Sequence, residues 1–238
     1  MLGKNGIWKR ADGQRRARLL FSGDLCPIRR VAHGLIAGDA DGVFGSTRAL
    51  FRGVDLAVVN LESPLCEELP PIEKLGPPFM ADPRIARTLR DVPVHVACLA
   101  NNHILDRGCE GLGQTLAALD EAGIAHVGAG MDVEAANRPL RLNAKGLPVA
   151  LINVGILEGA IPLDGPCAAR LDRLACRRAV ADAARDGGIV IPILHVGKEQ
   201  VPLPSPGVRR MGRELIDAGA AAVIGHHPHV PQGIEMYR

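Results

Sequence analysis

Short apolar runs, rich in valine, isoleucine and leucine, alternate along this chain with longer stretches in which apolar and charged residues are mixed. Runs of this kind are typical of strands that are buried on both faces of a parallel sheet. We therefore predict an α/β fold with strands at residues 17–23, 55–60, 94–100, 125–127, 148–154, 189–195 and 221–225.

The stretches between these runs carry the start and stop signals of helices. An Asp-Pro pair begins one stretch, a proline begins another, and Gly123, Gly187 and Gly219 follow three of them. These signals predict helices at residues 82–90, 109–122, 167–185 and 206–218. In contrast, residues 62–83 contain six prolines and little periodicity, so we expect a long irregular loop there, of the kind that is often functional.

The size and charge distribution of the chain fit one folded domain with a tail. Hydrophobic residues make up 47% of the 238 positions, which is enough to build a full core. The formal net charge is only +2, yet six basic residues lie within the first 18 positions. We therefore predict a basic N-terminal tail at residues 1–18 and a single domain at residues 19–238.

The composition also disfavours several classes of protein. The balance of charges and an aromatic content of 3% argue against a nucleic-acid-binding surface. No apolar run approaches the ~20 residues that span a bilayer, and the N-terminal segment lacks the apolar core of a signal peptide. The six cysteines include no C-x-x-C pair, and they suit a reducing compartment. We expect a cytoplasmic protein with no nucleic-acid partner and no membrane span.

Polar residues gather where the predicted strands end. Five strands deliver them at their carboxyl ends: Asp24, Glu62, the run Asn101-Asn102-His103, His195, and the pair His227 and His229. Ligands of open α/β sheets bind outside the carboxyl ends of the strands, so we expect these side chains to converge. Carboxylate, amide and imidazole groups together suit divalent Mn, Fe or Zn, and a bridging carboxylate allows two ions. The pattern therefore favours a dinuclear metal-dependent hydrolase.

Each of these residues also has an ordinary structural interpretation. Asp24 fits a turn or a cap, Asn101 and Asn102 fit left-handed turn positions, and His195 fits a half-buried histidine. The convergence of the whole set on one sheet edge favours the metal site over these separate interpretations. Nucleotide binding is disfavoured, because Gly128-Ala129-Gly130 lacks the third glycine of a dinucleotide-binding loop and no P-loop occurs. A serine-hydrolase elbow, G-x-S-x-G, is also missing from the sequence.

Longer segments around these positions resemble the CapA family of poly-gamma-glutamate capsule synthesis proteins, which belongs to the calcineurin-like metallophosphoesterase superfamily. The most specific matches are Asn101-Asn102-His103-Ile104-Leu105-Asp106 and Gly225-His226-His227-Pro228-His229. Further similarity at residues 22–24, 59–62, 78–83, 119–124, 127–130, 195–199 and 215–219 extends the resemblance over nearly all of residues 19–237.

The resemblance implies a fold, a ligand set and a catalytic residue. The implied fold is a four-layer α/β/β/α sandwich with a two-metal centre at one sheet edge. The implied metal ligands are Asp24, Glu62 in the bridging position, Asn102, His195, His227 and His229. His103 is implied to protonate the leaving oxygen or to stabilise its charge. Asp106 either orients His103 or caps the helix that is predicted to begin near Cys109.

The chain departs from the superfamily pattern at three positions near this site. Cys26 stands where the first block, Asp-x-His, has a histidine, and it is either a thiolate ligand or a small buried residue. Glu62 replaces the usual bridging aspartate, and Val196 replaces the tryptophan of a His-Trp-Gly segment. The family also continues beyond this sequence into a further strand, which allows a domain that lacks its last strand or strands and associates through an open sheet edge.

Two functions of different classes follow. The first, which we favour, is a dinuclear phosphoesterase linked to poly-gamma-glutamate or capsule synthesis, acting on a small phosphoester or a polyglutamate-related substrate. The second is a non-catalytic or weakly catalytic accessory of polyglutamate synthesis or export, whose pocket binds polymer or a partner. Nucleic-acid binding by the basic tail is a weaker third interpretation, because short charge runs are usually solvated.

Overall fold

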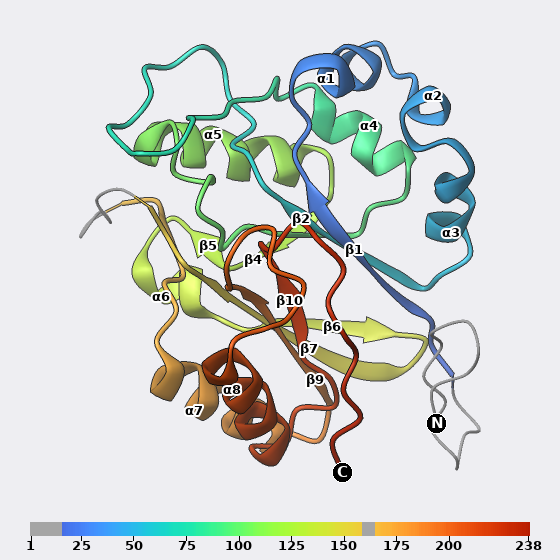
Figure 1. Ribbon diagram of the computed structural model, residues 1–238. Coiled ribbons are helices and arrows are strands. Elements are labelled where there is room, and N and C mark those ends of the chain that lie inside the picture. The colour runs from blue at the N-terminus through green and yellow to red at the C-terminus, as the bar shows by residue number, and fades with distance from the viewer. Residues whose placement is uncertain (1–15, 159–164) are drawn as a thin grey trace.

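Two four-stranded sheets form the centre of the computed structural model, which describes residues 16–158 and 165–238 (Figure 1). The first sheet is parallel and has the order β1 (Leu19–Leu25), β2 (Leu56–Leu61), β3 (Val96–Cys98) and β4 (Ala125–Val127). The second has the order β10 (Ile224–His226), β9 (Ile189–His195), β7 (Leu147–Gly155) and β6 (Leu140–Ala144), of which β6 is antiparallel to β7. The predicted α/β class is therefore confirmed.

Helices cover the outer side of each sheet (Figure 1). On the first sheet, leucines and other apolar residues form one core with the helices α1 (Arg29–Ile36), α2 (Ala40–Phe44), α3 (Arg48–Arg52), α4 (Ile85–Asp91) and α5 (Gly108–Glu121). On the second sheet, a separate core contains Val180 of α7 (Arg173–Arg185) and Leu215 of α8 (Pro206–Asp217). The short helix α6 (Val133–Asn137) lies beside a small antiparallel pair, β5 (Ala129–Gly130) and β8 (Cys167–Ala168).

A third core fills the space between the two sheets. Val58, Val96 and Cys98 of the first sheet belong to the same buried cluster as Leu151, Ile191 and Ile193 of the second. Each sheet is thus buried on both faces, which explains why its strands read as nearly continuous apolar runs in the sequence.

Asn153 of β7 joins the two sheets by hydrogen bonds inside this core. Its Oδ1 accepts a hydrogen bond from the backbone N–H of Ala100 at 2.7 Å, and its Nδ2 donates to the carbonyl of Ile193 at 3.1 Å. Two residues on, a Cβ placed on Gly155 would lie 2.1 Å from the carbonyl oxygen of Ala100, so only glycine fits there. The segment after β3 is therefore held against the carboxyl ends of β7 and β9.

All seven predicted strands are present, although their ends differ from the predicted ones. β4 and β9 have the predicted bounds, β3 is shorter than 94–100, and β10 begins at Ile224 instead of 221. Residues 62–83 are irregular as predicted, apart from a single bridge between Leu65 and Ala81.

The helix predicted at 167–185 is wrong at its start. Cys167–Ala168 form the strand β8, and α7 begins only at Arg173, because the side chain of Asp172 caps it by accepting the N–H groups of Leu174 and Ala175. The elements at residues 29–52, 133–137 and 140–144 were not predicted. Residues 1–15 of the predicted tail lie outside the described residues. Across the described parts of the chain, every helix is too short or too polar to cross a bilayer.

Candidate metal centre

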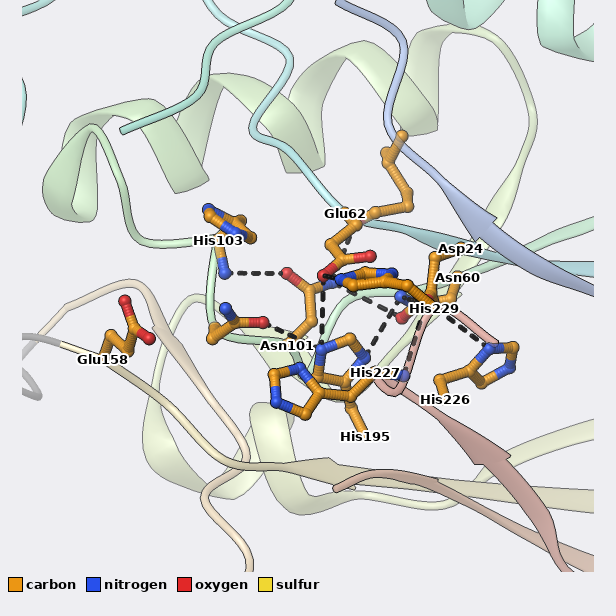
Figure 2. Close-up of polar contacts among 12 residues, drawn as sticks. Asp24, Asn60, Glu62, Asn101, His103, Glu158, His195, His226, His227 and His229 are labelled. Atoms are coloured by element: carbon orange, nitrogen blue, oxygen red, sulfur yellow. Dashed lines mark hydrogen bonds and ion pairs between the residues drawn. The ribbon is translucent and has the colours of Figure 1, made fainter. Parts of the chain in front are cut away.

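The predicted site residues come together at the carboxyl ends of parallel strands from both sheets (Figure 2). The first sheet contributes Asp24 in β1, Glu62 directly after β2 and the turn 101–103 after β3. The second sheet contributes His195 at the end of β9 and the turn 227–229 after β10. Residues 203 positions apart are thus in contact, as the backbone N–H of His227 donates to Asp24 Oδ2 at 3.2 Å.

Glu62 lies at the middle of this cluster and has no hydrogen-bond partner among the residues that the structure describes. Its side chain is only 2% exposed, and both carboxylate oxygens are buried without a donor. Its Oε1 lies 3.4 Å from the Nε2 of His195 and 3.8 Å from the Nε2 of His229. Burial, followed by the charge of Asp24, raises the pKa of Glu62 to about 7. A buried carboxylate in this state is costly unless a cation compensates it.

Asp24 is held by several donors at once. Asn60 Nδ2 donates to its Oδ1 at 2.9 Å, and His226 Nδ1 lies 3.0 Å from the same oxygen. Its Oδ2 lies 3.1 Å from His229 Nδ1. Burial raises the pKa of Asp24. The hydrogen bond and the charge of His226 outweigh this effect, His195 and His227 contribute further, and the pKa is lowered to about 2. Asp24 is therefore ionised at neutral pH.

Two of the histidines in the site are in their neutral form. Burial lowers the pKa of His195 to about 3, and burial also lowers the pKa of His227. The Nε2 of His195 lies 2.8 Å from Asn102 Oδ1, and its Nδ1 lies 3.2 Å from Asn60 Nδ2. Neutral imidazole is the form that binds metal ions.

The turn after β10 adopts a strained backbone to present its histidines. The φ angles of His227 and His229 are 96° and 54°, in the left-handed region that residues other than glycine rarely adopt. Strain of this kind costs of order 1–3 kcal/mol per residue and clusters at functional sites.

Among the described residues three groups of side chains have the spacing of metal ligands, and two of them overlap at Glu62. One consists of Asp24, Glu62 and His229, and the other of Glu62, His195 and His227; within each group the ligand atoms lie within 4.8 Å of one another. Both groups include Glu62, and Asn102 Oδ1 adjoins the second through His195. The predicted ligand set is thus brought together, with Glu62 common to both candidate ion positions.

His103 lies beside this cluster and is oriented by three neighbours. Its Nδ1 is 2.8 Å from Asp106 Oδ2, and its ring stacks on Phe79 with 4.1 Å between the ring centroids. Its backbone N–H donates to Asn101 Oδ1 at 3.1 Å. Asp106 thus contacts His103, whereas the first turn of α5 has no side-chain cap.

Lys74 of the irregular loop connects this histidine to other parts of the site. Its Nζ donates to Asp106 Oδ1 at 2.7 Å and to the carbonyl of Asn102 at 3.0 Å, and it pairs with Glu158 Oε2 at 2.8 Å. The Lys74 side chain is only 1% exposed. Neither Lys74 nor Asn60 was predicted as a site residue, because a lysine in a proline-rich loop and an asparagine within a strand carry no ligand spacing that a sequence pattern would reveal.

Cys26 is a neutral thiol in the metal-free chain. Burial, followed by the charge of Glu62, raises its pKa to about 12. All six cysteines are free. Of the two predicted roles for Cys26, a thiolate ligand is therefore the less favourable.

The comparison with known families decides the membership of the chain. Residues 18–238 match the family described as bacterial capsule synthesis protein PGA_cap. The chain belongs to this family. The resemblance to the CapA proteins predicted from the sequence is thereby confirmed.

Individual relatives support the same membership. A probable polyglutamine synthesis accessory protein of Mycobacterium tuberculosis is 34% identical over 208 residues, covering 77% of this chain and 52% of that protein. The capsule biosynthesis protein CapA of Bacillus anthracis is 28% identical over 226 residues, covering 91% of this chain and 55% of that protein. The chain thus spans about half the length of these relatives. A crystal structure of a hypothetical protein from Thermus thermophilus aligns with a TM-score of 0.49 and 18% identity, covering 90% of this chain and 68% of that one.

Proposed function

We propose that the chain is a metal-dependent hydrolase with a dinuclear centre, a phosphoesterase that serves poly-gamma-glutamate or capsule synthesis. The substrate that we propose is a small phosphoester or a polyglutamate-related phosphoester. We further propose that the two sheets and their covering helices are the four-layer α/β/β/α sandwich of the metallophosphoesterases, formed by a single domain at residues 19–238.

The observation that carries this proposal is the buried and unpartnered carboxylate of Glu62. Both of its oxygens lack a hydrogen-bond partner, and it belongs to both candidate ligand groups. A structural carboxylate would be expected to accept hydrogen bonds from the surrounding chain, as Asp106 does. A carboxylate that bridges two cations needs its oxygens free of such donors.

The donor set fits divalent Mn, Fe or Zn. We propose Asp24, Glu62, Asn102, His195, His227 and His229 as the residues that hold two ions, since neutral imidazole, amide and carboxylate groups suit these metals. When bound, such ions supply positive charge that activates water and stabilises phosphoryl oxygens.

His103 is proposed as the residue that protonates the leaving oxygen. The Nδ1 of His103 is engaged by Asp106 Oδ2 at 2.8 Å, so Nε2 is the ring nitrogen that remains available for proton transfer. Phe79 supports the ring from one face, and the same Asp106 oxygen accepts the backbone N–H of Phe79 at 2.6 Å. Asp106 is in our proposal a positioning residue, which keeps the imidazole in one tautomer and one orientation.

The decisive experiment combines metal analysis with hydrolysis. The full chain is purified without chelators, its metal content is measured by elemental analysis, and hydrolysis of bis(p-nitrophenyl) phosphate is followed with Mn²⁺. We expect bound transition metal, and a His103→Ala variant that retains the metal but loses activity by about 100-fold or more. His33→Ala, which changes an exposed histidine on α1, serves as the matched control and should behave as wild type.

Two results would contradict the proposal in different ways. A chain that binds no transition metal contradicts the centre itself. A chain that binds metal but hydrolyses no phosphoester favours an accessory role of the kind named for the mycobacterial relative, whereas hydrolysis that is unaffected by His103→Ala contradicts only the role proposed for His103.

A further inference from the structure

Glu199 lies on the turn that follows β9, and this turn is fastened to the histidine turn after β10. The backbone N–H of Gln200 donates to the carbonyl of Pro228 at 2.8 Å, and the N–H of Val196 donates to the carbonyl of His226 at 3.1 Å. Gly197 packs close to Pro228, since a Cβ on it would lie 3.2 Å from the proline Cγ. The position of Glu199 relative to the histidine turn is thus fixed by backbone contacts on both sides of it.

The side chain of Glu199 approaches two of the candidate ligands. A carboxylate oxygen of Glu199 and ring nitrogens of His227 and His229 all lie within 4.8 Å of one another. No hydrogen bond or ion pair of the Glu199 carboxylate occurs among the residues that the structure describes, although its charge acts on His227. The Nδ1 of His227 is also buried without a hydrogen-bond partner. Three donor atoms therefore converge without bonding to one another.

This third group connects the two candidate ion positions. It shares His229 with the group of Asp24 and Glu62, and it shares His227 with the group of Glu62 and His195. The histidine pair therefore lies between two carboxylates, of which Glu62 is buried and Glu199 is exposed.

The number of donors at the first position leaves room for a further ligand. Asp24, Glu62 and His229 provide three donors at this position. Divalent Zn and Mn take at least four ligands. The exposed carboxylate of Glu199, which lies within 4.8 Å of a ring nitrogen of His229, supplies a donor of suitable chemistry.

We infer that Glu199 is a further metal-ligating carboxylate of this centre, contributed from its solvent-exposed side. The inference rests on the metal centre proposed above and adds a residue to its ligand set. Because Glu199 is exposed, its carboxylate would exchange bound water for a divalent cation. We expect replacement of this carboxylate to leave the fold intact and to weaken the binding of the ion.

The test is a titration of the metal-free full chain with Mn²⁺, in which free Mn²⁺ is followed by electron paramagnetic resonance. We expect wild type to bind two equivalents, and Glu199→Gln to bind the weaker equivalent about tenfold or more less tightly. The matched control is Glu68→Gln, which removes the same charge from another exposed glutamate, on the irregular loop, and should titrate as wild type.

A second measurement separates ligation from simple loss of negative charge. Bound Co²⁺ has visible absorption bands whose position and intensity depend on its ligands, so we expect the spectrum of Glu199→Gln to differ from those of wild type and Glu68→Gln. An unchanged Co²⁺ spectrum overturns the inference, even if Mn²⁺ binds more weakly. A Mn²⁺ titration of Glu199→Gln that is identical to that of Glu68→Gln also overturns the inference. In both cases the proposed centre stands. If wild type binds no Mn²⁺, the inference and the proposed centre fail together.

Discussion

We expect Glu62 to make the metal-free chain less stable at neutral pH than a neutral residue would. Its carboxylate is buried and unpartnered, and its pKa is raised from 4.5 to about 7. As the pH rises, Glu62 loses its proton at a lower pH in the unfolded chain than in the folded one. Between pH 4.5 and about 7 the folded state therefore binds more protons, and the free energy of unfolding falls as the pH rises through this range. A bound cation reverses this penalty, because it supplies the charge that the protein lacks.

A Glu62→Gln substitution tests whether Glu62 destabilises the metal-free chain and stabilises the chain with bound cation. In metal-free protein at about pH 8 we expect the variant to unfold with a free energy about 1–3 kcal/mol higher than wild type, since a buried charge is removed. With saturating Mn²⁺ the order should invert, because the variant has lost the common ligand. Urea denaturation with and without Mn²⁺ provides both values. The prediction is contradicted if wild type is the more stable protein in the absence of metal.

Unlike Glu62, Lys74 is a buried charge that has carboxylate partners. It is buried against Asp106 and also pairs with Glu158. Replacing one member of a buried ion pair leaves the other uncompensated, so we expect Lys74→Met to lower the free energy of unfolding by about 3 kcal/mol. Thermal denaturation measures the loss, and Lys198→Met, at an exposed lysine, is the control that should change stability little. Equal melting temperatures for the two variants would disprove a structural role for the pair.

At the level of the elements, the start of β3 is held to β2 through a histidine. The N–H of Ala57 donates to His95 Nδ1 at 3.0 Å, while the N–H of His95 donates to the carbonyl of Ala57 at 2.9 Å. Burial, with a smaller effect of Arg90, lowers the pKa of His95 from its ordinary value of 6.5. The unfolded chain therefore takes up the proton first, and the contribution of this contact to stability is lost as the pH falls below 6.5.

We expect His95→Gln to reduce the pH dependence of stability. Between about pH 7.5 and about pH 5.5 wild type should lose more unfolding free energy than the variant, because only wild type carries this titrating group. Urea denaturation at both pH values gives the difference. His33→Gln, on the exposed side of α1, should retain the full wild-type dependence.

Gly155 permits the close approach of β7 to the segment after β3. A methyl group there would meet the carbonyl of Ala100 at 2.1 Å and the Cβ of His195 at 3.1 Å. We expect Gly155→Ala to cost about 1–3 kcal/mol of stability, because backbone atoms must move. It should also weaken Mn²⁺ binding by displacing Asn102 from His195. Gly225→Ala in β10 is the control, since its added Cβ would meet nothing within 4 Å. Equal stability of the two variants would contradict the close-approach argument.

The apolar pattern allowed the sheet-forming elements to be predicted, because buried parallel strands are continuous apolar runs. The same pattern could not locate the hairpin of β6 and β7, whose turn at Lys145 and Gly146 is carried by two positive φ angles of 51° and 81°. It also placed the start of α7 too early. The helix begins where the side chain of Asp172 accepts backbone N–H groups, and an apolar pattern does not reveal such a cap. Strand ends gave the positions of Asp24, Glu62 and the histidines, whereas Lys74 and Asn153 act through contacts far along the chain that no spacing encodes.

On the scale of the whole molecule, the proposed centre joins the two sheets. Asp24, Glu62 and Asn102 belong to the first sheet and its following loops, and His195, His227 and His229 to the second. A ligand that binds only the folded state stabilises it by about 2.7 kcal/mol when its concentration is 100 times the dissociation constant. We therefore expect Mn²⁺ to raise the melting temperature of wild type in differential scanning calorimetry, and EDTA to reverse the effect. The same shift in Glu62→Gln would indicate binding elsewhere.

The division of the donors between the two sheets also determines when the centre can form during translation. A nascent chain that has emerged from the ribosome only as far as β4 contains Asp24, Glu62 and Asn102 but none of the three ligand histidines. N-terminal segments begin to fold during synthesis, and the first sheet can collapse at that stage. In the proposed centre both ion positions are complete only once residue 229 has been made, so metal loading would be a late step in the production of this protein.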